Sequence, residues 1–251
     1  MKQAIGIDIG GTGIKGALVN LKKGELATER LRFDTPDGGK PSSVVKTVVE
    51  LVHLIDAPKN TPIGICFPAP VKDGVTLSAA NVSDEWIGLQ AGKLFSKALG
   101  TDVVLLNDAD AAGVAEIKFG AGQDQAGLVL MCTLGTGVGT ALFMNGKLIP
   151  NTELGHIEID GVDYETKAAY SAKERENLTF EQWSKVLSKY FDRLTRLLYP
   201  DLIIIGGGVS KEHASFIDLI ESNVKIVPAR SKNNAGIIGA AYYADKRLTK
   251  D

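Results

Sequence analysis

Two glycine-rich stretches carry the residues of this sequence best suited to chemistry. The first, at 9–16, reads Ile-Gly-Gly-Thr-Gly-Ile-Lys-Gly and follows an apolar run that contains Asp8. A glycine bend presents backbone N–H groups that can hold phosphate oxygens. A carboxylate just before it can hold a magnesium ion, through water, beside those phosphates. The pattern therefore predicts outer-sphere binding of Mg²⁺ by Asp8 and a phosphate or nucleotide site made of Gly10, Gly11, Thr12, Gly13 and Lys15.

The second stretch, at 134–142, repeats the first once one glycine is dropped. Apolar strand-like runs flank both copies, so we expect a duplicated architecture with one phosphate-binding hairpin in each half. The second hairpin would use Gly135, Thr136 and Gly137. A third cluster, Gly206, Gly207 and Gly208, follows an apolar strand at 202–205, where we expect the sugar or base of a nucleotide.

Other nucleotide-binding classes fit these stretches poorly. The dinucleotide fingerprint needs a helix after its glycines, whereas here a strand follows. The sequence has no P-loop signature and no His-Arg-Asp or Asp-Phe-Gly triplet of the protein kinases.

The pair Asn107–Asp108 stands at a strand-to-helix junction, where α/β proteins bind ligands. A sugar hydroxyl is a poor nucleophile, and a carboxylate placed on its proton can act as general base. We therefore expect Asp108 to be catalytic and Asn107 to bond a neighbouring hydroxyl. The alternative is that Asp108 is only the N-cap of the helix.

Glu153, His156 and Glu165 lie near glycine turns and could pair with the vicinal hydroxyls of a sugar. The alternatives for His156 are a structural histidine or a metal ligand. Glu153 and His156 could form half of a zinc site, but the partner ligands are absent.

Hydrophobic periodicity predicts an alternation of strands and helices, and therefore an α/β fold with mixed sheets. Helices are expected at 41–55, 89–99, from 107 onward, at 179–198 and at 236–247. A third strand is expected over 25–33, and Trp86 is expected to be exposed among turn-forming residues.

Composition limits the classes of protein. The chain has 251 residues, 44% hydrophobic, with a formal net charge of -2, so no global basic field indicates nucleic acid. Cys66 and Cys132 lie in apolar runs and are expected to be buried thiols rather than a disulfide. No apolar run has membrane-spanning length and no signal peptide is recognised, so we expect a cytoplasmic protein without a membrane partner.

Taken together and in order, these motifs resemble the ROK family of sugar kinases and repressors in the actin-like ATPase superfamily. The resemblance implies a ribonuclease H-like fold, with two α/β domains around a cleft and the closing helix packed back on the first. The small domain would comprise 1–106 and 236–251, and the large domain 107–235. The resemblance also implies that Asp108 is the catalytic base and that the sugar is bound by Asn81, Asn107, Glu153, His156 and Glu165.

One departure from the family pattern narrows the resemblance. Most members carry a cysteine-rich zinc segment, whereas 157–167 here has no cysteine, so no zinc site is expected. This short form resembles the branch that phosphorylates the 6-hydroxyl of glucose with inorganic polyphosphate. The alternatives are a kinase that uses ATP or accepts mannose, and a sugar-binding regulatory protein. The resemblance also implies a homodimer. We expect no counterpart of the DNA-binding segment that the repressors carry ahead of the first strand.

Overall fold

The computed structural model describes residues 2–249 and divides into two compact units. The first comprises Met1–Ala115 with Asn234–Asp251, and the second comprises Glu116–Asn233. The boundaries expected from the sequence, after residues 106 and 235, differ from these. The first unit, expected to be the smaller, is the longer of the two.

Helix α3, Asp108–Phe119, explains the different boundary. Its first turns pack on the closing helix α7, Ala235–Leu248, so closely that a Cβ at Gly239 would lie 1.7 Å from the carbonyl oxygen of Ala111. Ala111 and Ala240 share a buried cluster with Cys66. Small side chains on both helices therefore place residues 107–115 in the first unit.

The first unit is built on a six-stranded sheet in the order β3-β2-β1-β5-β8, with β4 also paired to β2. The hairpin of β1 and β2 is antiparallel, as the sequence predicts, and β1, β5 and β8 run parallel. The strands are β1 Gln3–Ile9, β2 Gly13–Asn20, β3 Glu25–Leu26, β4 Leu31–Asp34, β5 Ile63–Phe67 and β8 Val103–Asn107.

The expectation of one strand over 25–33 is wrong, because two short strands, β3 and β4, follow each other along the edge of β2. Between them, the Leu18 N–H of β2 donates to the side-chain oxygen of Thr28 at 3.1 Å. The Thr28 side chain therefore accepts the hydrogen bond of a β2 N–H group where the pairing of β2 is interrupted between β3 and β4.

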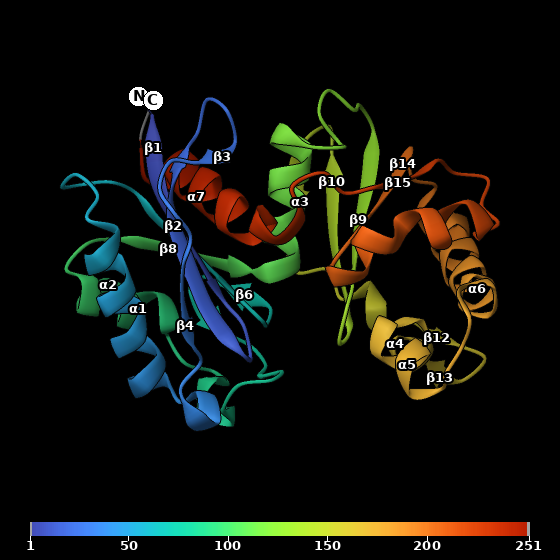
Figure 1. Ribbon diagram of the computed structural model, residues 1–251, viewed down its shortest axis with the longest axis horizontal. Helices are drawn as coiled ribbons and strands as arrows, with labels where there is room; N and C mark the ends of the chain where they lie inside the picture. The colour runs from blue at the N-terminus through green and yellow to red at the C-terminus, as the bar shows by residue number, and fades with distance from the viewer. Residues whose placement is uncertain (1, 250–251) are drawn as a thin grey trace. The chain divides into compact units, whose positions relative to one another are not determined.

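Helices cover both faces of this sheet. Helices α1, Pro41–Ile55, and α2, Ala91–Leu99, lie on one face, and α7 lies on the other (Figure 1). Two strand glycines admit α7, because a Cβ at Gly6 or Gly64 would lie 1.9 Å from a carbonyl oxygen of that helix. Helix α7 can approach the sheet this closely only because neither strand position carries a side chain.

Trp86 is buried, contrary to the expectation that it is exposed. Its indole N–H donates to Gly39 O at 2.8 Å, and its ring packs between Phe67 and Phe95. It belongs to the short elements of this unit, which are η1 Asp37–Gly39, β6 Val71–Lys72, β7 Val75–Thr76 and η2 Asp84–Trp86.

The second unit is built on a five-stranded sheet in the order β11-β10-β9-β14-β15. The second hairpin predicted from the sequence is confirmed, since β9 and β10 pair antiparallel around residues 135–137. The strands are β9 Leu128–Leu134, β10 Val138–Met144, β11 Lys147–Ile149, β14 Leu202–Gly206 and β15 Ile226–Pro228.

Helix α6, Phe180–Leu198, supplies much of the core of this unit. It begins at the capping box predicted from the sequence, in which Thr179 and Gln182 bond each other's backbone N–H groups. The remaining elements are η3 Leu154–His156, β12 Glu158–Ile159, β13 Val162–Asp163, α4 Glu165–Ala168, α5 Tyr170–Arg175, η4 Gly208–Ser215, η5 Ile217–Leu219 and η6 Lys232–Asn234.

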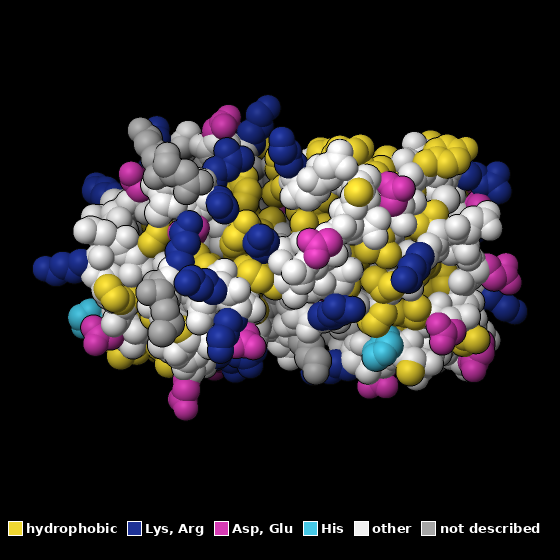
Figure 2. Space-filling model, turned by 90° about the horizontal axis from the view of Figure 1, so that it is seen from above, with side chains coloured by type: hydrophobic (Ala, Val, Ile, Leu, Met, Phe, Trp, Pro, Cys, Tyr) yellow, Lys and Arg dark blue, Asp and Glu magenta, His cyan; other side chains and the backbone are white. Residues whose placement is uncertain are grey.

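The face drawn in Figure 2 carries exposed cations and carboxylates side by side, in keeping with the small net charge of -2. Among the residues that the structure describes, no helix has the length and apolar character needed to span a bilayer.

Candidate active site

The first glycine bend is braced by the chain segment that follows β2. Gly10 N–H closes the bend by donating to Gly13 O at 3.0 Å. The Thr35 hydroxyl donates to Gly10 O at 2.6 Å. Nη2 of Arg32 donates to Thr12 O at 3.2 Å. These donors occupy carbonyl oxygens whose partial negative charge would repel a phosphate, so the bend suits an anion.

The second bend is closed and braced in the same way, although it is one residue shorter. Gly135 N–H donates to Gly137 O at 3.0 Å. The Ser171 hydroxyl donates to Thr136 O at 2.6 Å, as Thr35 does for the first bend. The sequence repeat therefore corresponds to a repeated local structure.

Asp8 lies on β1 between two donors. Its Oδ2 is 3.3 Å from Nζ of Lys15, and its Oδ1 accepts from Sγ of Cys66 at 3.4 Å. Burial raises the pKa of the Cys66 thiol well above its usual value, and the Asp8 charge raises it further. The sulfur therefore keeps its proton and can donate it to Asp8.

The carboxylate of Asp8 fits magnesium held mainly through water. Within residues 2–249, no group of three or more His, Cys, Asp or Glu side chains is arranged to hold a metal ion. Magnesium retains several waters and is commonly bound by one or two carboxylates together with substrate phosphates. A single carboxylate before a phosphate-type bend meets that requirement.

Asn107 is the N-cap of α3. Its Oδ1 accepts from the N–H groups of Ala109 and Asp110, at 2.8 and 3.1 Å. The capping role considered for Asp108 is therefore filled by its neighbour, although Oδ1 of Asp108 also accepts from Ala109 N–H at 2.7 Å. Asp108 is exposed, and its charge contributes to the raised pKa of Cys66, so the Asp8 and Asp108 carboxylates both lie near that thiol.

Asn81 packs against the first bend. A Cβ at Gly11 would lie 2.8 Å from the Cβ of Asn81. Asn81 has a φ of 63°, a left-handed conformation that asparagine tolerates better than most residues. The structure thus brings a residue expected at the sugar next to the expected phosphate site of the same unit.

In the second unit, the structure brings Glu153, His156 and Glu165 together. Burial raises the pKa of Glu153, His156 lowers it, and Glu165 raises it. The pKa of His156 is also raised, first by its hydrogen bond with Asp163, whose Oδ2 lies 3.0 Å from Nδ1. The carboxylates of Glu165 and Glu153 contribute to the same shift. This cluster can offer acceptors and a cationic donor to sugar hydroxyls.

Glu165 is fixed against the second glycine bend. Its Oε2 accepts from the N–H of Val138 at 2.7 Å, and a Cβ at Gly137 would lie 2.6 Å from the same oxygen. One carboxylate oxygen is therefore engaged by the bend, while the group still acts electrostatically on Glu153 and His156.

The third glycine cluster adjoins the second bend. A Cβ at Gly207 would lie 2.3 Å from the carbonyl oxygen of Leu134, and Gly207 has a φ of 84°. Only glycine suits both conditions. Gly206, Gly207 and Gly208 are thereby brought next to Gly135 within the second unit.

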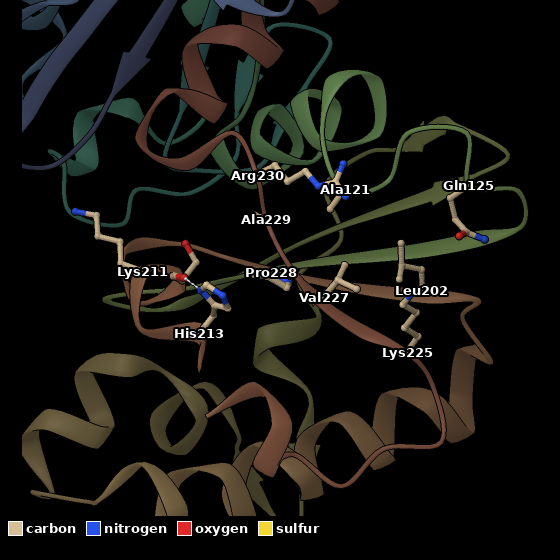
Figure 3. A pocket seen from close by; sticks show the side chains of 11 residues that line it. Ala121, Gln125, Leu202, Lys211, His213, Lys225, Val227, Pro228, Ala229 and Arg230 are labelled. Atoms are coloured by element: carbon tan, nitrogen blue, oxygen red, sulfur yellow. Dashed lines mark hydrogen bonds between the residues drawn. The ribbon is translucent and has the colours of Figure 1, made fainter. Parts of the chain in front are cut away.

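The second unit has a cavity of about 640 Å³ (Figure 3). It adjoins the third glycine cluster, because the hydroxyl of its lining residue Ser210 donates to Gly207 O at 2.8 Å. Its walls combine apolar side chains with cations, and Lys211 and Lys225 lie at opposite ends of it in Figure 3. Glu116 fixes one wall, because its carboxylate accepts from the backbone N–H of Arg230 at 3.0 Å. The cavity is lined by Ala121, Gln125, Leu202, Ser210, Lys211, His213, Lys225, Val227, Pro228, Ala229 and Arg230.

Sequence reasoning missed three residues that contact the candidate residues of their own unit. Cys66 was expected only as a buried hydrophobe, and neither Arg32 nor Asp163 was singled out. A carboxylate seven residues after His156 is a local signal that could have indicated the Asp163 partner. Strand pairing brings Arg32 to the first glycine bend and Cys66 to Asp8, so the sequence carries no local signal for these two residues.

The structure resembles solved sugar kinases over almost its whole length. The inorganic polyphosphate/ATP-glucomannokinase from Arthrobacter sp. strain KM matches with a TM-score of 0.92 and 45% identity, covering 98% of this chain and 100% of that one. A ROK family glucokinase from Streptomyces griseus matches in fold with a TM-score of 0.83 and 24% identity, covering 97% and 99% of the two chains. The protein therefore has the actin-like ATPase fold of these kinases.

Sequence relatives agree with the structural ones. The polyphosphate glucokinase of Mycobacterium tuberculosis is 42% identical over 241 residues, which cover 96% of this chain and 90% of that protein. The polyphosphate glucokinase of Mycobacterium leprae is also 42% identical, over 98% of this chain and 76% of its own length. The ROK family model matches residues 4–168. The chain belongs to the ROK family.

Proposed function

We propose that this protein is a glucokinase that transfers the terminal phosphoryl group of inorganic polyphosphate to the 6-hydroxyl of glucose. The observation that carries the proposal is the similarity, over nearly the whole chain, to proteins named for that reaction. The arrangement of the strand-end residues supports it, because phosphoryl transfer depends mainly on positioning and charge neutralisation.

Asp108 is the general base in this proposal. Its carboxylate accepts the proton of the glucose 6-hydroxyl as the oxygen–phosphorus bond forms. The bond between the terminal phosphorus and its bridging oxygen breaks, and the shortened polyphosphate leaves with that electron pair. Asn107 supports this role, because its oxygen is engaged in the cap and its amide nitrogen can donate to a sugar hydroxyl.

The remaining sugar contacts are assigned to Asn81, Glu153, His156 and Glu165. The raised pKa of His156 favours the protonated ring, which donates to a sugar oxygen. Glu153 is exposed and accepts from a hydroxyl. This assignment is tested by replacing each group and measuring the KM for glucose.

The two bends are assigned to the donor phosphates. The bends at Gly10–Gly13 and Gly135–Gly137 supply N–H groups other than those of Gly10 and Gly135, which close the bends. Thr12 and Thr136 supply exposed hydroxyls, and Lys15 supplies a positive charge. Magnesium, when bound, would neutralise charge on the reacting phosphates, and Asp8 would hold it through water. Cys66 and Lys15 keep the Asp8 carboxylate in place for that role.

ATP is a second candidate donor, favoured by the cavity beside Gly206, Gly207 and Gly208. Its volume of about 640 Å³ is within the range of pockets that hold small ligands. Apolar walls at Leu202 and Val227 suit a nucleobase, and the cations suit phosphates. Mannose is a second candidate acceptor, because the Arthrobacter relative is named a glucomannokinase.

A donor and acceptor panel with purified protein tests the proposal. Glucose, mannose and Mg²⁺ are combined with nucleotide-free polyphosphate or with ATP, and the sugar 6-phosphate is measured. Appreciable product with polyphosphate alone is expected. Product with ATP only would show that the donor is ATP rather than polyphosphate. No product with either donor would favour a sugar-binding regulatory protein.

Cellular location and assembly complete the proposal. Both cysteines are buried and unpaired, which fits the reducing cytoplasm. A homodimer is expected by analogy with the family, and analytical ultracentrifugation of the whole chain would measure it.

A further inference from the structure

Three charged side chains form a row across the strands that flank the first glycine bend. The register pairs Asp8 of β1 with Lys15 of β2, and Lys15 with Arg32 of β4. Directly opposed residues share a face of the sheet, and neighbouring strands lie about 5 Å apart. Arg30 lies just before β4, and its side chain bonds Asn234, next to the first residue of α7. The same end of α7 lies beside Asp8, because a Cβ at Gly236 would be 3.4 Å from Cγ of Asp8. Arg30 therefore extends the row at this end of α7.

Both arginines of the row are positioned by hydrogen bonds to oxygens of uncharged groups. The guanidinium of Arg32 lies on the bend, since a Cβ at Gly13 would be 2.9 Å from its Nε, and it donates to Thr12 O. Nη1 of Arg30 donates to Oδ1 of Asn234, just before α7, at 3.1 Å. A guanidinium has five N–H donors, so each arginine can bond an anion while it keeps these contacts.

The charges of the row are only partly compensated. Lys15 faces Asp8, and the only carboxylate bonded to Arg32 among the described residues is that of Asp34, at 3.2 Å. The Asp34 side chain is 86% exposed, so this ion pair is weak and can be displaced by a stronger anion. Arg30 bonds a neutral amide. Like charges placed opposite one another destabilise a sheet, so an anion lying along the row would stabilise it.

We infer that Lys15, Arg32 and Arg30 form a track for the phosphates of polyphosphate that lie beyond the reacting one. This inference rests on the proposed function and adds the site that distinguishes a long donor from a short one. A polyphosphate chain carries a negative charge at every phosphate, and arginine bonds phosphate in a bidentate manner. A nucleoside triphosphate ends after three phosphates and gains less from the track. No aromatic residue belongs to the track, which argues against single-stranded nucleic acid as its ligand.

The test uses the double variant R30Q/R32Q of the full chain, with R30Q alone as a second variant that leaves the brace of the bend intact. The matched control is K22Q/K23Q, which removes two exposed cations from the turn at the other end of β2. We expect the double variant to raise the KM for long-chain polyphosphate about ten times as much as it raises the KM for tripolyphosphate. The slope of log KM against log salt should fall by about 0.7 for each cation removed.

A second readout is binding of long-chain polyphosphate by titration calorimetry without glucose. We expect wild type to bind, R30Q/R32Q to bind about tenfold more weakly, and D34N, which removes the competing carboxylate, to bind more tightly. If wild type neither binds nor uses polyphosphate, the proposed function itself fails.

The inferred track is contradicted if wild type uses polyphosphate but R30Q and R30Q/R32Q leave the ratio of KM for long-chain polyphosphate to KM for tripolyphosphate unchanged. A loss of equal size in K22Q/K23Q would also overturn it. Equal competition by oligothymidylate would show a general polyanion surface instead.

Discussion

The Cys66 thiol donates to Oδ1 of Asp8 across 3.4 Å, from the strand paired in register beside it. The thiol is fully buried, and its raised pKa keeps it protonated, so this is a permanent donor to the carboxylate proposed for magnesium. The contact gives a buried cysteine a function that depends on hydrogen bonding rather than on reactivity.

Replacing Cys66 by alanine should therefore weaken magnesium use. The thiol is a weak donor, so loss of this hydrogen bond to a charged group should raise the Mg²⁺ concentration for half-maximal activity by about three- to tenfold. Cys66→Ser, which keeps a donor, should recover part of this loss. Cys132→Ala, an equal truncation at a buried site of the second unit, should lower the melting temperature and leave the Mg²⁺ dependence unchanged. An unchanged Mg²⁺ dependence in Cys66→Ala would contradict the role assigned to the hydrogen bond between Cys66 and Asp8.

Asp108→Asn should abolish most of the turnover. An amide cannot accept the proton of the sugar hydroxyl, so kcat should fall by about 10²- to 10⁴-fold while KM for glucose changes by only a few-fold. The control is Asp102→Asn, which neutralises an exposed carboxylate just before β8. Steady-state kinetics with polyphosphate and glucose measure both variants, and wild-type turnover in Asp108→Asn would refute the general-base role.

The pair of His156 and Asp163 should make stability depend on pH. The hydrogen bond raises the pKa of His156 in the folded protein above that of an unfolded histidine, near 6.5. The stabilisation is therefore complete below the unfolded pKa and is lost as pH rises through the folded pKa. The pair is about half exposed, so we expect less than about 1 kcal/mol.

Unfolding of wild type and Asp163→Asn by urea between pH 5.5 and 8 measures this difference, which should shrink as pH rises. NMR titration of the His156 ring should show a lower pKa in Asp163→Asn, with His53 and His213 as internal references. A stability difference that grows with pH would contradict the assignment.

Gly137 and Gly135 differ in the room around them, although they lie in the same bend. A Cβ at Gly137 would lie 2.6 Å from Oε2 of Glu165, whereas nothing lies within 4 Å of a Cβ at Gly135. Gly137→Ala should therefore destabilise the protein by about 1–3 kcal/mol through displacement of Glu165. Gly135→Ala should change the free energy of unfolding by less than about 0.5 kcal/mol. Equal stability of the two variants in urea titrations would show that Glu165 is not fixed by the bend.

The sequence by itself determined the two hairpins, their glycine bends and the long helices. These features depend on neighbours in the chain: glycine allows the bend at 10–13 and again at 135–137, and Thr179 with Gln182 starts α6 through bonds three residues apart. The resemblance to ROK kinases rests on the same local patterns, and for that reason it could be seen before the fold.

Tertiary structure alone decided which residues meet at these bends. Cys66 reaches Asp8, and Arg32 reaches Gly13, through strand pairing between segments distant in the chain. Trp86 is buried because Phe67 and Phe95 pack on its ring, although turn-forming residues surround it in sequence. A local pattern records the preference of a segment, whereas such contacts depend on the free energy of packing that segment against others.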